Sequence, residues 1–227
     1  MTEAELCELD ALLASHDSAK WDSFYQDRTK PCPFFGASPD ESLAEWIRAR
    51  LLRSGRAIDL GCGNGRNAIF LARQGFVVEA VDYSQAAIAW AQDRITEAGV
   101  AVSLNHRSVF DLELAAGSHD LVCDSGCFHH IPPHRRGRYV DLVFSALKTG
   151  GWFSLTCLRP EGGSGYSDDE VYDRRSLGGG LGYTEARLRE IWSEGLQIRV
   201  VRQMTKPRKE GDLFGEDFLW ALLAQKT

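Results

Sequence analysis

The sequence predicts a doubly wound α/β fold whose mostly parallel sheet has seven strands and ends in an antiparallel hairpin. Three observations lead to this fold class. From residue 56 onward, short apolar runs alternate with helix-like segments, which is the pattern of β-α-β units. A glycine-rich turn follows the first of these runs. The last two apolar runs have no helix between them, so we expect them to pair antiparallel.

The elements follow in chain order from the spacing of their apolar residues. Strands are predicted at 57–60, 76–81, 101–105, 121–123, 152–157, 196–200 and 218–224. Helices are predicted at 3–14, 67–73, 84–97, 133–147 and 184–192. A polar turn is expected at 206–212, between the last two strands.

A further helix is predicted from a strong start signal at residues 38–41. Ser38 is the expected N-cap, Pro39 suits the first helical position and Glu41 completes a capping box. Gly55 is expected to end this helix. One apolar face follows the start, formed by Leu43, Trp46, Ile47 and Leu51.

The chain is divided into an N-terminal helical lid segment, residues 1–42, and an α/β domain, residues 43–227. The N-terminal segment is rich in aromatic residues and proline. These rings either pack on the core or cover a pocket, and the sequence favours neither. The aromatic residues proposed to reach a substrate are Trp21, Tyr25, Phe34 and Phe35.

Composition limits which binding partners and which cellular compartment we expect for this protein. The 227 residues carry a net charge of −6, whereas proteins that bind a nucleic-acid backbone usually present a basic face. The cluster Arg135, Arg136 and Arg138 is interpreted as the solvated first turn of a helix. The six cysteines are expected to be free thiols, and no signal peptide or membrane-spanning run is visible. We therefore expect a cytoplasmic protein with no nucleic-acid or membrane partner.

The residues that carry most information run from Asp59 to Asn67, between a strand and a helix. Glycines at 61, 63 and 65 let the backbone turn sharply and approach a ligand. At the end of the next strand, Asp82 is placed to accept hydrogen bonds from ribose hydroxyls. Gly63-x-Gly65-x-x-Ala68 also satisfies a loose dinucleotide fingerprint. Asp59 argues against a dinucleotide, because a carboxylate there repels phosphate and attracts an ammonium group.

This stretch resembles motif I of the class I S-adenosylmethionine-dependent methyltransferases, a Rossmann-like family. Lys148-Thr149-Gly150-Gly151 is similar to the family's turn into strand five, with Thr149 where proline is usual. The resemblance implies S-adenosyl-L-methionine as cofactor, with Asp82 on its ribose and Asp124 near its methyl group. The cofactor-binding residues that the resemblance implies are Asp59, Gly61, Cys62, Gly63, Asn64, Gly65, Asn67, Asp82, Tyr83, Ser108, Val109, Phe110 and Asp124.

The N-terminal aromatic segment resembles the tellurite-resistance and thiopurine methyltransferase branch of that family. Those enzymes cover a small, soft nucleophile with such a segment. The resemblance implies a small-molecule acceptor, methylated on sulfur or nitrogen. Besides the N-terminal aromatic residues, Cys127 and Tyr183 are predicted to contact it.

Methyl transfer needs a base when the acceptor must lose a proton. His130, with His129 as the second choice, is the candidate, because both follow the fourth strand. The alternative is that both make only structural hydrogen bonds. A metal site from Cys123, Cys127, His130 and His134 is not expected, since Gly126 and Pro132-Pro133 prevent one continuous helix.

Two questions stay open at the level of sequence. The glycine-rich stretch 164–183 is either a disordered surface loop or a mobile substrate loop. The chain as a whole has two alternatives to a methyltransferase: a nicotinamide-dependent oxidoreductase, or a protein that binds S-adenosylmethionine without catalysis. The identity of the acceptor and the oligomeric state are not readable from the residues.

Overall fold

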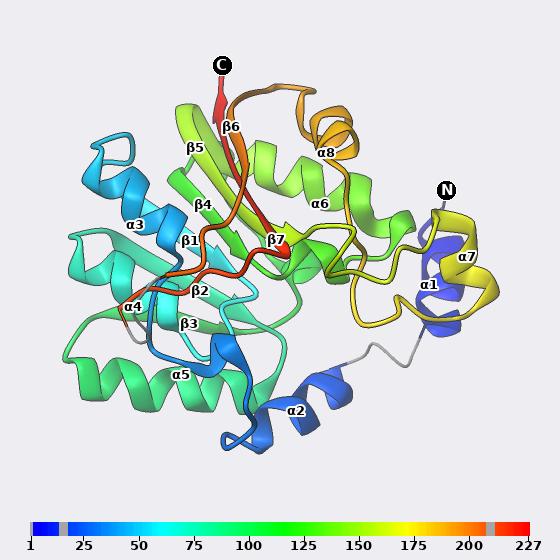
Figure 1. Cartoon of the computed structure of the whole chain (residues 1–227), viewed down its shortest axis with the longest axis horizontal. Coiled ribbons are helices and arrows are strands. Elements are labelled where there is room, and N and C mark those ends of the chain that lie inside the picture. The colour runs from blue at the N-terminus through cyan, green and yellow to red at the C-terminus, as the bar shows by residue number, and fades with distance from the viewer. Residues whose placement is uncertain (1, 14–17, 208–211) are drawn as a thin grey trace.

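A seven-stranded sheet forms the centre of the computed structural model, which describes residues 2–13, 18–207 and 212–227 (Figure 1). The strand order is β3-β2-β1-β4-β5-β7-β6. Strands β1 to β5 are parallel, and β7 runs antiparallel to both β5 and β6. The predicted fold class is confirmed. The strands are β1 Arg56–Leu60, β2 Val77–Asp82, β3 Val102–His106, β4 His119–Ser125, β5 Leu147–Leu158, β6 Leu196–Gln203 and β7 Leu219–Lys226.

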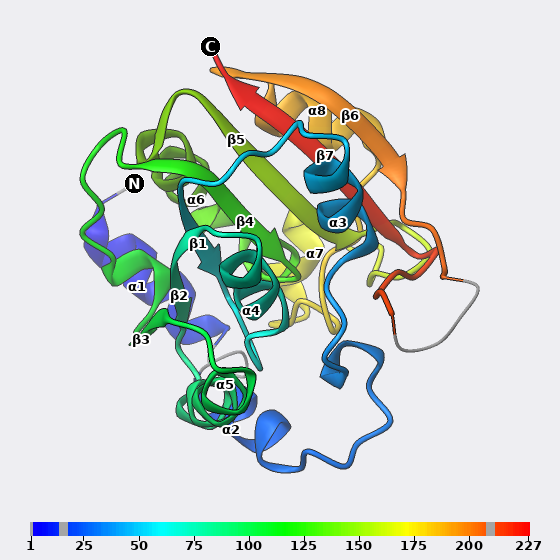
Figure 2. The same ribbon diagram turned by 90° about the vertical axis from the view of Figure 1, so that its left-hand side faces the viewer.

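Helices cover both faces of the sheet, as Figures 1 and 2 show. Side chains alternate along β1, so Ala57 joins the core under one helical layer and Ile58 joins the core under the other. One layer holds α3 Glu41–Arg48, α4 Arg66–Arg73 and α5 Gln85–Ala98. The opposite layer holds α6 Pro133–Ala146 and α8 Glu185–Trp192. The carboxyl ends of the parallel strands therefore open at one edge, where doubly wound sheets bind ligands.

Two helices were not predicted. Helix α2, Ser18–Gln26, packs against α5, and α7, Asp168–Asp173, bonds to α6 through Asp168 and Arg136 (Figure 1). Helix α1 spans Glu3–Leu12 and contacts α6. The spacing of Trp21, Phe24 and Tyr25 is helical, but the aromatic and proline-rich composition obscured it. Helix α7 has six residues within a glycine-rich stretch, too few for a clear period.

The predicted start of the helix at Ser38 is wrong. Helix α3 begins at Glu41 and its N-cap, Asp40, makes no side-chain capping bond. The carboxylate of Asp40 instead pairs with Arg66, at 2.6 Å, and accepts a hydrogen bond from Thr156. The backbone at residues 39–41 bonds to Phe214, which holds it extended. Long-range pairing thus overrides the local capping signal.

The same helix also ends earlier than predicted. Its last residue is Arg48, so Leu51 lies beyond it and is 43% exposed rather than on the buried face. Of the predicted polar turn at 206–212, residues 208–211 lie outside the described part of the chain, and so does residue 14 of the predicted first helix. Within the described residues, no helix combines the length and apolar character needed to cross a bilayer.

Candidate active site

A cavity of about 420 Å³ opens at the carboxyl ends of β1, β2 and β4, under α1 and α2. That volume is within the range of about 300–1,000 Å³ usual for ligand pockets. Its lining comes from the sheet edge, from the loops that follow the strands and from the N-terminal helices. The lining residues are Glu3, Asp10, Leu13, Trp21, Tyr25, Gly61, Asp82, Tyr83, Ser108, Val109, Phe110, Asp111, Gly126, Cys127, His130, Ile131, Pro132, Arg135 and Arg138.

The glycine turn brings backbone, rather than side chain, to the cavity. Gly61 has a φ of +68°, and a Cβ there would lie 2.7 Å from Cβ of Cys127. Gly63 has a φ of +54°, and a Cβ there would lie 2.6 Å from the hydroxyl oxygen of Tyr25. Only glycine fits at either position. The turn can therefore lie directly beneath both the loop after β4, at Cys127, and helix α2, at Tyr25.

Asp82 is held at the cavity by two backbone hydrogen bonds. Its Oδ2 accepts from the amide of Gly63 at 2.9 Å, and its Oδ1 accepts from the amide of Ser84 at 2.9 Å. Burial raises the pKa of Asp82, while these two bonds oppose the rise. Each carboxylate oxygen keeps a lone pair for a further donor. The carboxylate is thus oriented before any ligand arrives.

Asp59 lies under the turn, 2% exposed and outside the cavity lining. Its Oδ2 is buried and has no hydrogen-bond partner in the part of the chain that the structure describes. Burial raises the pKa of Asp59 to about 7, and the guanidinium of Arg66 opposes that rise. A buried carboxyl oxygen without a partner is costly unless something else supplies a donor. The Oδ2 atom of Asp59 could therefore accept a hydrogen bond from a positively charged donor.

The other residues predicted to bind cofactor divide into two groups. Tyr83, Ser108, Val109 and Phe110 line the cavity, as Gly61 and Asp82 do. Outside the lining lie Cys62, Gly63, Asn64, Gly65, Asn67 and Asp124.

Two residues of the second group attach the N-terminal segment to the glycine turn. The side-chain amide of Asn64 donates to the carbonyls of Phe34 and Phe35, at 3.2 and 3.1 Å. The Oδ1 of Asn67 accepts from the amide of Asp40 at 3.0 Å. In this structure these side chains hold the protein's own chain rather than facing the cavity.

Asp124 shapes the loop after β4. Its carboxylate accepts from the amides of Cys127, at 2.8 Å, and Phe128, at 3.0 Å, and from the hydroxyl of Tyr139. Burial raises the pKa of Asp124 to about 7, and the Tyr139 hydroxyl and the two amides oppose the rise. These bonds set the turn that places Cys127 in the lining.

The two neighbouring histidines have different surroundings. His130 lines the cavity, and its ring meets the indole of Trp21 edge-on, with centroids 4.6 Å apart. His129 is buried outside the lining, and burial lowers its pKa to about 3. His129 is therefore neutral near pH 7, and of the two only His130 lines the cavity.

Three of the six predicted substrate residues reach the cavity: Trp21, Tyr25 and Cys127. Phe34 and Phe35 instead pack around Phe24 and do not line it. Tyr183 stacks on Phe128, with centroids 5.0 Å apart, and borders a separate cavity.

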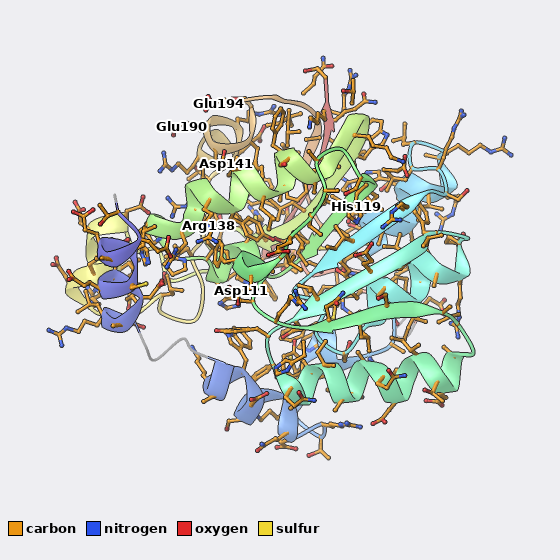
Figure 3. All side chains as sticks on the ribbon, turned by 180° about the vertical axis from the view of Figure 1, so that it is seen from behind. Asp111, His119, Arg138, Asp141, Glu190 and Glu194 are labelled. Atoms are coloured by element: carbon orange, nitrogen blue, oxygen red, sulfur yellow. The ribbon has the colours of Figure 1, made fainter. Side chains whose placement is uncertain are left out.

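The interpretation of the arginine cluster as a solvated helix turn is wrong for two of its members. Arg135 and Arg136 are only 6% and 7% exposed. Arg135 pairs with Asp10 and with Glu3, and Arg136 makes two bonds of 2.9 Å to Asp168. Helices α1 and α7 bring these acids over the first turn of α6, which no local pattern reveals. Arg138 remains half exposed and lies on α6, as Figure 3 shows.

Sequence reasoning did not assign Glu3, Asp10, Leu13, Arg135 or Arg138 to the cavity. The arginine cluster itself was visible, but the acidic partners of Arg135, Asp10 and Glu3, lie more than a hundred residues away in the chain. The weighed metal ligands do not gather, since Cys123 is in the core and His134 contacts Asp10 and Tyr172. No group of acids, cysteines and histidines in the described residues is arranged to hold a metal ion.

Comparison with known proteins shows what this chain is similar to. Residues 57–151, from β1 to the start of β5, match a family model described as "Methyltransferase domain". This stretch of the chain is therefore similar to a methyltransferase domain. An uncharacterized methyltransferase of Schizosaccharomyces pombe is 39% identical over 74 residues, which are 33% of this chain and 51% of that protein. The chain spans about half the length of the curated relatives it matches.

Solved structures place this methyltransferase domain in the class I fold. A structure titled "Conversion of a Disulfide Bond into a Thioacetal Group during Echinomycin Biosynthesis" superposes with a TM-score of 0.72 at 22% identity, covering 92% of each chain. The 1,6-didemethyltoxoflavin-N1-methyltransferase of Burkholderia thailandensis, solved with S-adenosylhomocysteine, gives 0.64 at 20% identity, covering 99% of this chain and 89% of that one.

The predicted resemblance to the class I methyltransferases is therefore confirmed, while the narrower branch is supported only loosely. TehB of Haemophilus influenzae superposes with a TM-score of 0.61 at 15% identity, covering 81% of this chain and 62% of that one. That score does not exceed those of the other neighbours, so the fold does not single out this branch.

Proposed function

We propose that this protein transfers a methyl group from S-adenosyl-L-methionine to a small-molecule acceptor, at a sulfur or nitrogen atom. The observation that carries the proposal is the pair of carboxyl groups at the glycine turn, Asp59 and Asp82. Asp82 is preoriented for a ribose, and Asp59 has a buried oxygen in need of a cationic donor. A nucleoside with an ammonium-bearing tail satisfies both.

The same observation disfavours a dinucleotide. The cofactor side of the cavity contains Asp82, with Asp59 beneath the turn, and the lining arginines are already paired with Asp10 and Glu3. A pyrophosphate would meet negative charge there without a free basic group in the described lining. We therefore rank a nicotinamide-dependent oxidoreductase well below a methyltransferase.

Bound S-adenosylmethionine supplies an activated methyl group on a cationic sulfur. The protein's part is to position the acceptor, exclude water and remove a proton from the acceptor where it carries one. His130 is the base in this proposal, because its ring faces the cavity. Cys127 and the aromatic residues Trp21 and Tyr25 form the wall against which the acceptor packs.

The N-terminal helices α1 and α2 line the cavity and so limit the size of the acceptor that it can hold. In this proposal the N-terminal segment, predicted as residues 1–42 ahead of an α/β domain at 43–227, covers the cavity through its described lining residues Glu3, Asp10, Leu13, Trp21 and Tyr25. A cavity of about 420 Å³ suits a cofactor and a compact acceptor better than a macromolecule. Two neighbouring structures support the same class, since one is an N1-methyltransferase of 1,6-didemethyltoxoflavin and the other concerns conversion of a disulfide bond into a thioacetal group.

Calorimetric titration with S-adenosylhomocysteine, with NADH in parallel, tests the cofactor. We expect micromolar affinity for S-adenosylhomocysteine and none for NADH; the reverse would make the protein an oxidoreductase. A screen of thiols, chalcogen oxyanions and heterocyclic amines with methyl-labelled cofactor then tests catalysis. Binding without turnover on any acceptor would favour a non-catalytic S-adenosylmethionine-binding protein.

His130→Gln tests the base. We expect kcat to fall by about 10²–10⁴-fold, the usual contribution of a general base, with little change in S-adenosylhomocysteine affinity. An unchanged kcat across the pH range would remove His130 from the mechanism.

A further inference from the structure

The glycine-rich segment after β5, expected to be either disordered or mobile, is firmly attached to the histidine pair. The amide of Leu181 donates to the carbonyl of His129 at 2.8 Å. The carbonyl of Gly180 accepts from the amide of Ser164 at 2.9 Å, and the amide of Tyr183 donates to the carbonyl of Leu158 at 2.9 Å. The segment is thus bonded to the loop after β4 and to the end of β5.

Gly180 lies where a side chain would meet both imidazoles. Its φ is +136°, and a Cβ there would lie 2.7 Å from Cδ1 of Leu158 and 2.9 Å from Cδ2 of His129. The same Cβ would lie 3.2 Å from Cε1 of His130. The histidine rings therefore occupy space that only glycine leaves open.

The ring of His130 has two aromatic neighbours and adjoins the space that a side chain at residue 180 would fill. Trp21 meets it edge-on at 4.6 Å, and the ring of His129 lies 4.3 Å away, centroid to centroid. A Cβ on Gly180 would approach its Cε1 to 3.2 Å. Trp21 belongs to the cover and Gly180 to the segment after β5, so two regions distant in sequence determine where this imidazole lies.

We propose that Gly180 is a positioning residue for His130: by leaving out a side chain, it lets the imidazole lie toward the cavity in the orientation that accepts the acceptor's proton. This inference rests on the proposed function, in which His130 is the base. Residue 180 touches neither cofactor nor acceptor, since it does not line the cavity. In this proposal Gly180 affects the reaction only by setting the position of the His130 ring.

Gly179 provides a matched control one position away. Its φ is +93°, so an alanine there carries a comparable backbone strain. A Cβ at Gly179, however, has no neighbour within 4 Å. The difference between Gly180→Ala and Gly179→Ala therefore isolates the contact with the histidine pair from the strain of the backbone.

Two measurements on these variants test the proposal. In Gly180→Ala we expect kcat to fall by about tenfold to a hundredfold, because displacing a reacting group by about 1 Å has an effect of this size. The S-adenosylhomocysteine affinity should stay within about twofold of the parent, since the cofactor side is untouched. The acid limb of the pH–kcat profile should also move, which a purely structural defect would not cause. Gly179→Ala should leave all three unchanged.

The second measurement needs no turnover. The ¹³Cε1 resonance of His130, assigned with His130→Gln, should shift in Gly180→Ala and stay in place in Gly179→Ala. An unmoved resonance, or equal effects of the two alanines on kcat, would overturn the proposal. If the parent shows no methyl transfer, the proposed function fails, while the resonance still reports whether Gly180 holds the ring.

Should Gly180→Ala not fold, a double variant keeps the test available. Leu158→Ala removes the atom that lies 2.7 Å from the added Cβ and leaves the two histidine contacts. Leu158→Ala/Gly180→Ala is then compared with Leu158→Ala alone, with the same expected differences in kcat and in the His130 resonance.

Discussion

The two sides of the cavity are built differently. On the cofactor side, the sheet edge carries Gly61, Asp59 and Asp82, which are held by backbone hydrogen bonds or by burial in the core. On the cover side, α1 buries none of its own residues and meets α6 through ion pairs, such as that between Asp10 and Arg135. The sheet side is therefore fixed in the absence of a ligand, whereas α1 depends on contacts that water and salt weaken.

The cover itself is not uniform. Helix α2 contributes an aromatic cluster in which Tyr25 stacks on Phe35 and Phe35 meets Trp90 of α5 edge-on. Helix α1 contributes charge, with Glu3 and Asp10 over Arg135. We expect α2 to behave as part of the core and α1 as the more readily detached half. Substitutions on the two sides should differ accordingly.

The largest effect is expected from Asp82→Ala on the cofactor side. Removing a preoriented carboxylate that, in our proposal, accepts hydrogen bonds from two ribose hydroxyls should weaken S-adenosylhomocysteine binding by about a hundredfold or more, at ~1.5–3 kcal/mol for each charged hydrogen bond. Calorimetry measures the change. Asp141→Ala, the same substitution at an exposed position on α6 labelled in Figure 3, is the control. Equal affinities in the two variants would contradict the proposed ribose contact.

Asp59 should make cofactor affinity depend on pH. Its pKa of about 7 means that the carboxyl is partly neutral in the empty protein, and only the carboxylate attracts an ammonium group. S-adenosylhomocysteine affinity should thus rise with pH by up to about tenfold per unit below 7 and level off above it. Asp59→Asn should bind weakly and lose this rise; if the rise persists, another group is responsible.

The stability of the empty protein should depend on Asp59 in the opposite direction. Its pKa is raised from 3.8 in the unfolded chain to about 7, so the folded state holds the proton more tightly. The free energy of unfolding is therefore expected to fall as pH rises between these two values. Denaturant titrations at pH 5 and 8 should show Asp59→Asn gaining stability relative to the parent at the higher pH. A gain that is the same at both values would contradict the assignment.

On the aromatic part of the cover, Trp21→Ala should have an intermediate effect. The substitution removes the ring that meets His130 and part of the acceptor wall. We expect kcat/KM for the acceptor to drop by about tenfold, the size of one lost aromatic contact of ~1.5 kcal/mol. Trp21→Phe, which keeps an aromatic ring, should recover most of this loss. Failure of phenylalanine to recover activity would indicate that the indole nitrogen matters instead.

The smallest effect is expected from Asp10→Asn on the charged part of the cover. Its ion pair with Arg135 is partly exposed, as is its hydrogen bond to His134, and such surface pairs contribute about 0–1 kcal/mol. Stopped-flow measurement should show S-adenosylhomocysteine dissociating about two- to fivefold faster, with weaker dependence on salt than in the parent. A loss as large as that of Asp82→Ala would mean that α1 is as integral to the site as the sheet edge.

The amino-acid sequence alone determined those features of the fold that depend on residues close together in the chain. The order of strands and helices follows from the period of apolar residues, and the glycine turn with Asp59 and Asp82 lies within one β-α-β unit. The terminal hairpin was predictable for the same reason, since two strands without a helix between them must run antiparallel. Such features depend on spacing over a few residues and on the chirality of the chain.

Only the tertiary structure decided the features that join distant segments. Ser38 does not cap the helix, because Asp40 pairs with Arg66 and the chain stays extended until Glu41; Arg135 is buried because α1 covers it. A Cβ on Gly180 would lie 3.2 Å from Cε1 of His130, a residue fifty positions earlier in the chain (180 − 130). The local pattern around each of these residues permitted another arrangement. The desolvation of a charge and the packing of a ring depend on which segments meet across the fold, and that information is not contained in any short stretch of the chain.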